Sequence, residues 1–342
     1  MKSKYRNIFL AFGIVAVIIM MFTFDMDYNE LWSNLKRAGY YFPLIILLWV
    51  FVYLLNATAW YQIIRDGKKA YVPFWRVYKL SISGFALNYV TPVGLMGGEP
   101  YRIMELKPFI GVERATSSVI LYVMMHISSH FCLWIAAVFV YICFYPVNMI
   151  MGILLSLIIV FCLFFAIIFI RGYRSGMAVA FVRICSKIPI LKKYAANIAE
   201  KYSEQLKAID QQIALLHQKR KRTFYTALLL EFTARVLSCM EVWLILNILT
   251  TDVSFIDCVL IVAFSSLLAN LLFFMPMQLG GREGGFALAV GGLSMSGAYG
   301  VYTALITRVR ELIWIVIGLA LMKIGNKKSE ATNYLTNDEK RL

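Results

Sequence analysis

Two segments far apart in the chain repeat one arrangement of proline, glycine and glutamate. The first, TPVGLMGGEP at residues 91–100, contains Glu99, and the second, MPMQLGGREG at residues 275–284, contains Glu283. Proline and glycine interrupt helices, so each segment predicts a polar break followed by a half-helix whose N-terminal N–H groups favour an anion such as phosphate. Each glutamate either stabilises the helix dipole or binds a cationic group, a proton or an arginine. The residues that form the breaks are Pro92, Gly97, Gly98, Pro276, Gly280 and Gly281.

Arginines near the breaks supply the matching positive charge. Arg102 and Arg282 lie close to the two glutamates, and the planar guanidinium fork suits the oxygens of a phosphate. The segment ALITRVRELIWIVIG adds Arg308 and Glu311, which share one helical face at i, i+3 spacing and could neutralise each other. Arg310 lies too deep in this apolar run to reach the interface easily. It is therefore a candidate partner for the second glutamate or for a phosphate.

Two further pairs at i, i+4 spacing place polar residues inside apolar segments. Glu231 and Arg235 predict an internal salt bridge, with a gate as the alternative. His126 and His130 have the spacing of two zinc ligands, but no third ligand is evident, so we prefer a neutral pair lining a polar cavity. The candidate binding residues are Glu99, Arg102, His126, Arg282, Glu283, Arg308 and Arg310.

The composition places these residues inside a membrane. The chain is 61% hydrophobic and only 15% charged, whereas soluble domains are about half apolar and a quarter charged. The net charge of +15 indicates basic cytoplasmic loops rather than nucleic-acid binding. Six apolar runs approach the ~20 residues that span a bilayer. They are residues 8–24, 41–64, 115–145, 147–170, 223–249 and 301–324, and two further runs, 74–91 and 255–275, end at the breaks.

Lysine and arginine in the loops predict the topology, because they favour the cytoplasmic side. Both flanks of residues 80–99 are basic, so this segment is expected to enter and leave by one face. The second half repeats the pattern in the opposite direction. We therefore predict an all-α polytopic membrane protein with six spanning helices, two re-entrant hairpins, an inverted-topology repeat and cytoplasmic termini. The alternative is eight full spans. The corresponding units are a first helix at 1–25, membrane halves at 26–171 and 223–325, a linker at 172–222 and a tail at 326–342.

The basic linker contains one amphipathic segment. Apolar residues at helical spacing predict an interfacial helix attracted to anionic lipid headgroups, and the alternative is a regulatory or partner-binding site. These residues are Ile198, Tyr202, Leu206, Ile209, Ile213 and Leu216.

The motifs NYVTPVGLMGGEPYR and FFMPMQLGGREGGFAL, with the helix that carries Arg308, resemble the transmembrane region of the lysylphosphatidylglycerol synthase/flippase family. This family includes the multiple peptide resistance factor and stand-alone relatives. The resemblance implies a bacterial cytoplasmic-membrane protein that moves lipids between leaflets. The aminoacyl-transferase domain of full-length members has no counterpart here, so synthase activity is not expected. His126 aligns with Arg310 when the two glutamates are superposed, which predicts two pockets of related shape but different chemistry.

The function that these observations favour is that of a lipid flippase acting on a phospholipid or lipid-linked intermediate with an anionic headgroup. No nucleophile with an adjacent base and no metal set is evident, so we expect neither catalysis nor a cofactor. The alternative is a membrane partner or scaffold for a separately encoded lipid-modifying enzyme. A homodimer is a further candidate assembly.

Overall fold

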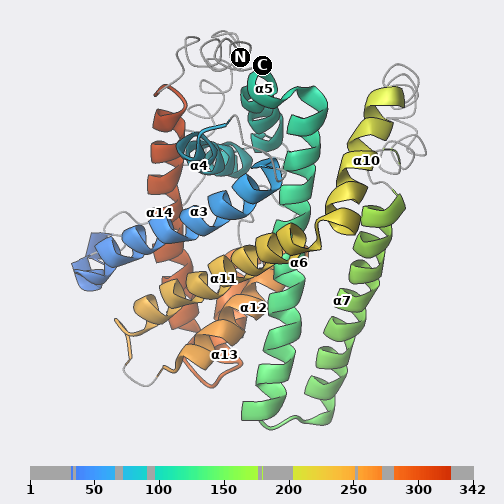
Figure 1. The fold of residues 1–342 in the computed structure, drawn as a ribbon. Helices are drawn as coiled ribbons and strands as arrows, with labels where there is room; N and C mark the ends of the chain where they lie inside the picture. The colour runs from blue at the N-terminus through green and yellow to red at the C-terminus, as the bar shows by residue number, and fades with distance from the viewer. Residues whose placement is uncertain are drawn as a thin grey trace, which may run out of the picture.

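The computed structural model describes residues 32–33, 36–65, 72–90, 97–175, 179, 203–250, 253–271 and 281–324. Every regular element in these residues is a helix, which confirms the all-α prediction. The predicted span at 8–24, the tail and most of the linker lie outside the described residues, as do Pro92, Pro276 and Gly280. The helices are α3 (Tyr41–Arg65), α4 (Phe74–Val90), α5 (Gly98–Ile110), α6 (Val112–Phe144), α7 (Met149–Ser175), α10 (Ser203–Lys219), α11 (Lys221–Leu246), α12 (Phe255–Leu271), α13 (Gly281–Gly291) and α14 (Gly297–Leu321) (Figure 1).

Within the described residues, three helices are long and apolar enough to cross a bilayer. They are α3, α6 and the Met149–Gly172 part of α7. They coincide with three of the predicted runs, so the helices expected there are confirmed. Only 11% of the apolar window of α7 is buried. Since most of its large side chains are exposed, α7 presents a surface suited to lipid rather than to water.

Two other long helices, α11 and α14, carry charged side chains within their apolar sequence. At ~1.5 Å per residue, helices of 26 and 25 residues exceed the ~30 Å hydrocarbon core. Glu231 and Glu241 of α11, and Arg308 and Arg310 of α14, are each no more than 3% exposed. The charges thus face protein rather than lipid, as intramembrane charges must. That these two helices span the membrane remains a prediction.

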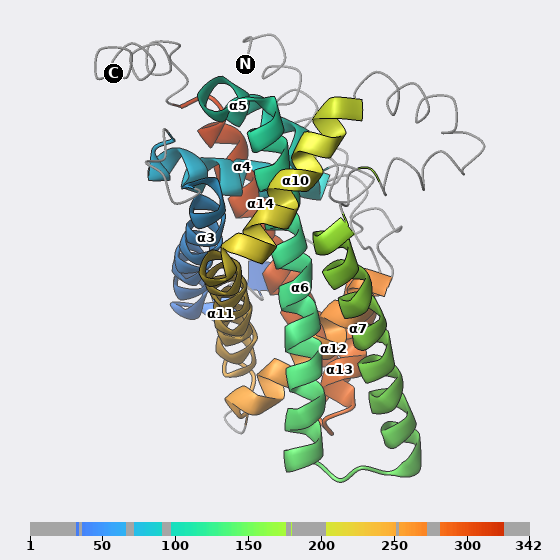
Figure 2. The same ribbon diagram turned by 45° about the vertical axis from the view of Figure 1, so that its right-hand side comes forward.

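Each of the two short helices α4 and α12 packs against a long helix of the other half, and long helices of the two halves also pack together. α4 contacts α14, α12 contacts α6, and α3 packs beside α11. The pairs α4–α5 and α12–α13 lie toward opposite ends of α6 (Figures 1 and 2). With 17 residues, α4 and α12 reach about 26 Å, less than the hydrocarbon core. An inverted repeat predicts this arrangement, and the re-entrant path of the hairpins stays a prediction.

The amphipathic segment of the linker forms α10, which packs against α6 and α7. Ile209 and Ile213 on its apolar face are 6% and 0% exposed and belong to the same core cluster as Phe224 and Ala227 of α11. This part of the apolar face therefore packs on protein rather than on lipid headgroups, unlike the face of the interfacial helix expected from the sequence.

Candidate functional site

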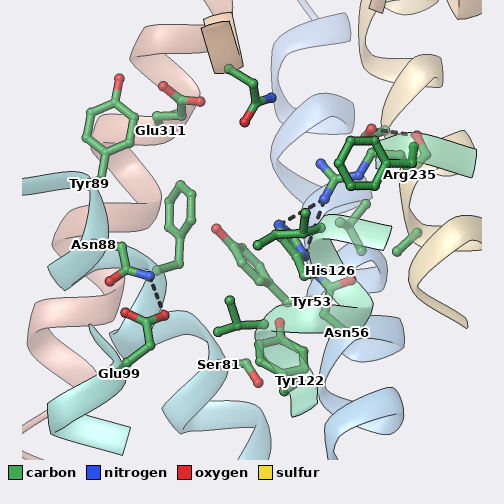
Figure 3. A pocket seen from close by; sticks show the side chains of 18 of the residues that line it. Tyr53, Asn56, Ser81, Asn88, Tyr89, Glu99, Tyr122, His126, Arg235 and Glu311 are labelled. Carbon is green, nitrogen blue, oxygen red and sulfur yellow. Dashed lines mark hydrogen bonds between the residues drawn. The ribbon is translucent and has the colours of Figure 1, made fainter. Parts of the chain in front are cut away.

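A cavity of about 540 Å³ lies among the helices and receives side chains from α3 to α7 and from α11 to α14. Residues that flank both breaks line it, including Asn88 and Glu99 from the first half and Asn270 and Arg282 from the second. The sequence predicts a separate pocket at each break. In the described residues the flanks of both breaks instead meet at one shared cavity, because the short helices of each half pack against the other half (Figure 3).

The first break is held together by Asn88 of α4. Its side-chain oxygen accepts a hydrogen bond from the Gly98 N–H at the start of α5, at 2.7 Å. Its amide nitrogen donates to Oε1 of Glu99 at 2.9 Å, and that oxygen also lies 3.2 Å from Nη1 of Arg102. Glu99 Oε2 is buried without a hydrogen-bond partner in the described structure. Glu99 therefore anchors the half-helix and lines the cavity, and one of its carboxylate oxygens is left unpaired among the described residues.

Replacing Asn88 by alanine removes both of these hydrogen bonds. Loss of a helix-capping side chain costs about 1 kcal/mol, and a lost hydrogen bond to a charged group costs about 1.5–3 kcal/mol, so we expect a fall of about 2–4 kcal/mol in the free energy of unfolding. Thermal unfolding of the purified protein measures it. The matched control is Asn270→Ala, since the Asn270 amide donates only to Ser266 O of its own helix and the side chain is exposed. Equal melting temperatures for the two variants would contradict the assignment.

Arg102 is buried between α4, α5 and α6. It donates from Nη2 to Ser81 O at 3.1 Å, and its guanidinium lies 5.2 Å from the Tyr122 ring centre. A Cβ at Gly84 would lie 2.2 Å from Arg102 Nε, so only glycine at position 84 leaves room for this side chain. The guanidinium is thus held by backbone oxygens and by Glu99 rather than left open to a ligand.

The second break is held by two ion pairs between α13 and α14. Arg308 donates from Nε to Oε1 of Glu283. Arg282 donates from Nη1 to both oxygens of Glu311, at 2.6 and 2.7 Å. The predicted pairing of Arg308 with Glu311 is therefore wrong, because each charge finds its partner on the neighbouring helix rather than three residues along its own. Arg282 and Glu311 line the cavity, whereas Glu283 and Arg308 are not part of its lining.

Arg310 forms a buried network with α3 and α11. Its Nε and Nη2 donate to the two oxygens of Glu241, both at 2.8 Å, and its guanidinium lies 3.7 Å from the Trp49 ring centre. Trp49 Nε1 also donates to Glu241, at 3.0 Å. The predicted pairing of Arg310 with Glu283 is thus wrong, while binding of a phosphate by Arg310 stays a prediction. Trp49 therefore packs on a buried cation and bonds to its carboxylate partner.

The predicted Glu231–Arg235 salt bridge is replaced by a three-residue chain through His126 of α6. His126 Nδ1 lies 2.8 Å from Glu231 Oε2, and Arg235 Nη2 lies 2.9 Å from His126 Nε2. A carboxylate can only accept and a guanidinium can only donate, so the imidazole is neutral with its proton on Nδ1. His126 and Arg235 line the cavity (Figure 3), whereas His130, the other member of the predicted cavity-lining pair, is not among the lining residues.

Several cavity residues are absent from the sequence prediction. Tyr53 and Asn56 of α3 each leave a buried side-chain oxygen without a hydrogen-bond partner among the described residues. The isolated asparagine in LLNATAW was an available signal, because a polar amide is costly in an apolar span. Tyr53 gave no such signal, since tyrosines are frequent throughout this chain. No group of three potential metal ligands occurs in the described part of the chain.

The fold and the site define an all-α membrane protein whose helices enclose a cavity lined by charged residues. The model of the family described as "Lysylphosphatidylglycerol synthase TM region" matches residues 8–319, so the chain belongs to this family. That membership indicates a membrane function related to lipids. No curated protein and no solved structure matches the chain significantly.

Proposed function

We propose that this protein is a lipid flippase that moves a phospholipid or a lipid-linked intermediate between the two leaflets. The observation that carries the proposal is the cavity, lined by both charged and aromatic side chains, that the described flanks of both breaks share. At about 540 Å³ it falls within the ~300–1,000 Å³ range of pockets that hold small molecules. Such a volume accommodates a lipid headgroup, while the acyl chains remain in the bilayer.

The two walls of the cavity differ in a way that suits an amphiphile. Charged side chains from α5, α11, α13 and α14 and amide side chains from α3, α4 and α12 form one part, whereas Phe131, Trp134, Phe161 and Phe165 line the part toward α6 and α7. Since α7 is the most lipid-exposed of the membrane-length helices, this aromatic wall suits acyl chains. The headgroup would face the polar wall, and movement of the opposed hairpins would open the cavity to one leaflet at a time.

The test is flipping of a fluorescent phosphatidylglycerol in proteoliposomes that contain the purified full chain. Ser238 of α11 lines the cavity, so Ser238→Trp is expected to fill headgroup space and to reduce the protein-dependent rate several-fold. Thr233→Trp is the matched control, because Thr233 lies on the same helix but is exposed. Melting temperatures of both variants establish that they fold.

Wild-type protein that does not accelerate flipping would refute the proposal and would favour the role of a membrane partner for a separate enzyme. Equal flipping by wild-type protein and Ser238→Trp would show that lipid does not pass through this cavity.

A further inference from the structure

The described guanidiniums that line the cavity outnumber the carboxylates that line it. Among the described lining residues there are three guanidiniums and two carboxylates. Arg102 pairs with Glu99, and Arg282 pairs with Glu311. The remaining guanidinium, that of Arg235, makes no direct ion pair with a described carboxylate; it reaches Glu231 only through the neutral imidazole of His126.

The guanidinium of Arg235 also has unused hydrogen-bonding capacity. It donates from Nη2 to His126, whereas Nε is buried and lacks a partner in the described structure. An unpaired cation and an unsatisfied donor are both costly at membrane depth, and an anion would satisfy both. Because a guanidinium can bind two oxygens at once, a phosphate suits these donors better than a halide.

A second donor faces the cavity from the neighbouring helix. Tyr53 of α3 lines the cavity, its hydroxyl is buried without a hydrogen-bond partner in the described structure, and α3 packs directly beside α11. Asn56, one turn further along α3, lines the same cavity, and its amide nitrogen is a donor, whereas its buried oxygen is an acceptor that takes no part in binding an anion (Figure 3). A phenol, an amide and a guanidinium can together surround an anion with neutral and charged donors.

We propose that Arg235, with Tyr53 and Asn56, binds the phosphate of an anionic phospholipid headgroup. This proposal rests on the proposed lipid-transport function and specifies its headgroup subsite. It differs from the sequence expectation, which assigned the anion to Arg282, Arg308 or Arg310. Each of those guanidiniums is already paired with a carboxylate. His126 fixes the orientation of Arg235 and is a positioning residue.

The experiment measures binding of dioleoyl phosphatidylglycerol to the detergent-purified full chain by native mass spectrometry. Dioleoylglycerol, which has the same acyl chains and no phosphate, is the comparison lipid. Arg235→Gln is expected to weaken phosphatidylglycerol binding about tenfold or more and to leave dioleoylglycerol unchanged. The phosphatidylglycerol affinity of Arg235→Lys should lie between those of wild type and Arg235→Gln, because lysine keeps the charge but lacks the planar guanidinium fork. Arg222→Gln, an exposed arginine of the same helix, should bind as wild type.

The milder variant Tyr53→Phe covers the case in which Arg235→Gln does not fold. It removes one hydroxyl, keeps the ring, and should weaken phosphatidylglycerol binding about threefold. Unchanged binding in folded Arg235→Lys and Tyr53→Phe would overturn the proposal, as would an equal loss of both lipids in Arg235→Gln. Inorganic phosphate is added as a competitor. If it displaces the lipid at low millimolar concentration through the same residues, the site serves free phosphate and the lipid assignment fails.

Binding and flipping give separable outcomes. Wild-type protein that binds phosphatidylglycerol through Arg235 but flips no lipid would disprove the transport function and leave the subsite standing. Normal flipping by wild-type protein and by Arg235→Gln, with unchanged binding, would disprove the subsite alone.

Discussion

Arg310→Gln is expected to lower the free energy of unfolding by about 3–5 kcal/mol, because removing one partner leaves the Glu241 charge buried without its cation. The pair is bidentate, and both side chains are at most 4% exposed. It joins α14 to α11, and Trp49 adds α3. At about 2.1 cal/mol/K of unfolding entropy per residue, a chain of 342 residues should lose roughly 4–7 °C in melting temperature, measured by tryptophan fluorescence in detergent.

Two comparison variants show whether the loss of stability in Arg310→Gln arises because the ion pair is buried. Lys207→Gln breaks the Lys207–Glu204 pair, whose side chains are 61% and 85% exposed, and should change stability by less than ~1 kcal/mol. The double variant Arg310→Met, Glu241→Leu removes both charges and should recover much of the loss, since well-packed apolar residues often replace a buried ion pair at little cost. A single variant as stable as Lys207→Gln would show that the Arg310 network does not hold these helices together.

Gly98→Ala is the second large expected effect. A Cβ at this position would lie 2.2 Å from the Gly84 carbonyl oxygen and 2.7 Å from Asn88 Oδ1. Since the nearest atom belongs to the backbone, α4 and α5 must separate to admit the methyl group. Overpacking of this kind costs about 1–3 kcal/mol, and loss of the Gly98 N–H bond to Asn88 adds about 1 kcal/mol. Thermal unfolding measures this loss of stability, and the flipping assay shows whether the hairpin still functions.

Gly284→Ala is the matched control in the second hairpin. A Cβ there meets no atom within 4 Å, and alanine has the higher helix propensity. The control is therefore expected to be neutral or stabilising by up to ~1 kcal/mol. If both alanine variants behave alike, the close approach of α4 and α5 at Gly98 does not occur in the folded protein.

The sequence predicted the candidate residues better than it predicted their partners. The candidates Glu99 and Arg102 bond to each other, and Asn88, which was not a candidate, joins them because one short hairpin brings this stretch of 15 residues together. The arginines of α14 were assigned by spacing along one helix, yet Arg308 bonds to Glu283 of α13 and Arg310 bonds to Glu241 of α11. Spacing identifies residues that share a helical face, but it does not reveal which neighbouring helix covers that face.

The sequence alone determined that the protein is helical and membrane-embedded, because its apolar runs exceed what a water-soluble core can bury. It also indicated that Glu99, Glu283, Arg308, Arg310 and Glu311 need polar partners, since lipid cannot solvate them. Only the tertiary structure decided that the flanks of both breaks share one cavity and that Arg235, rather than Arg310, remains without a direct carboxylate partner. The physical reason is that ion pairing depends on distances of a few ångströms between helices, and those distances are set by packing between segments far apart in the chain.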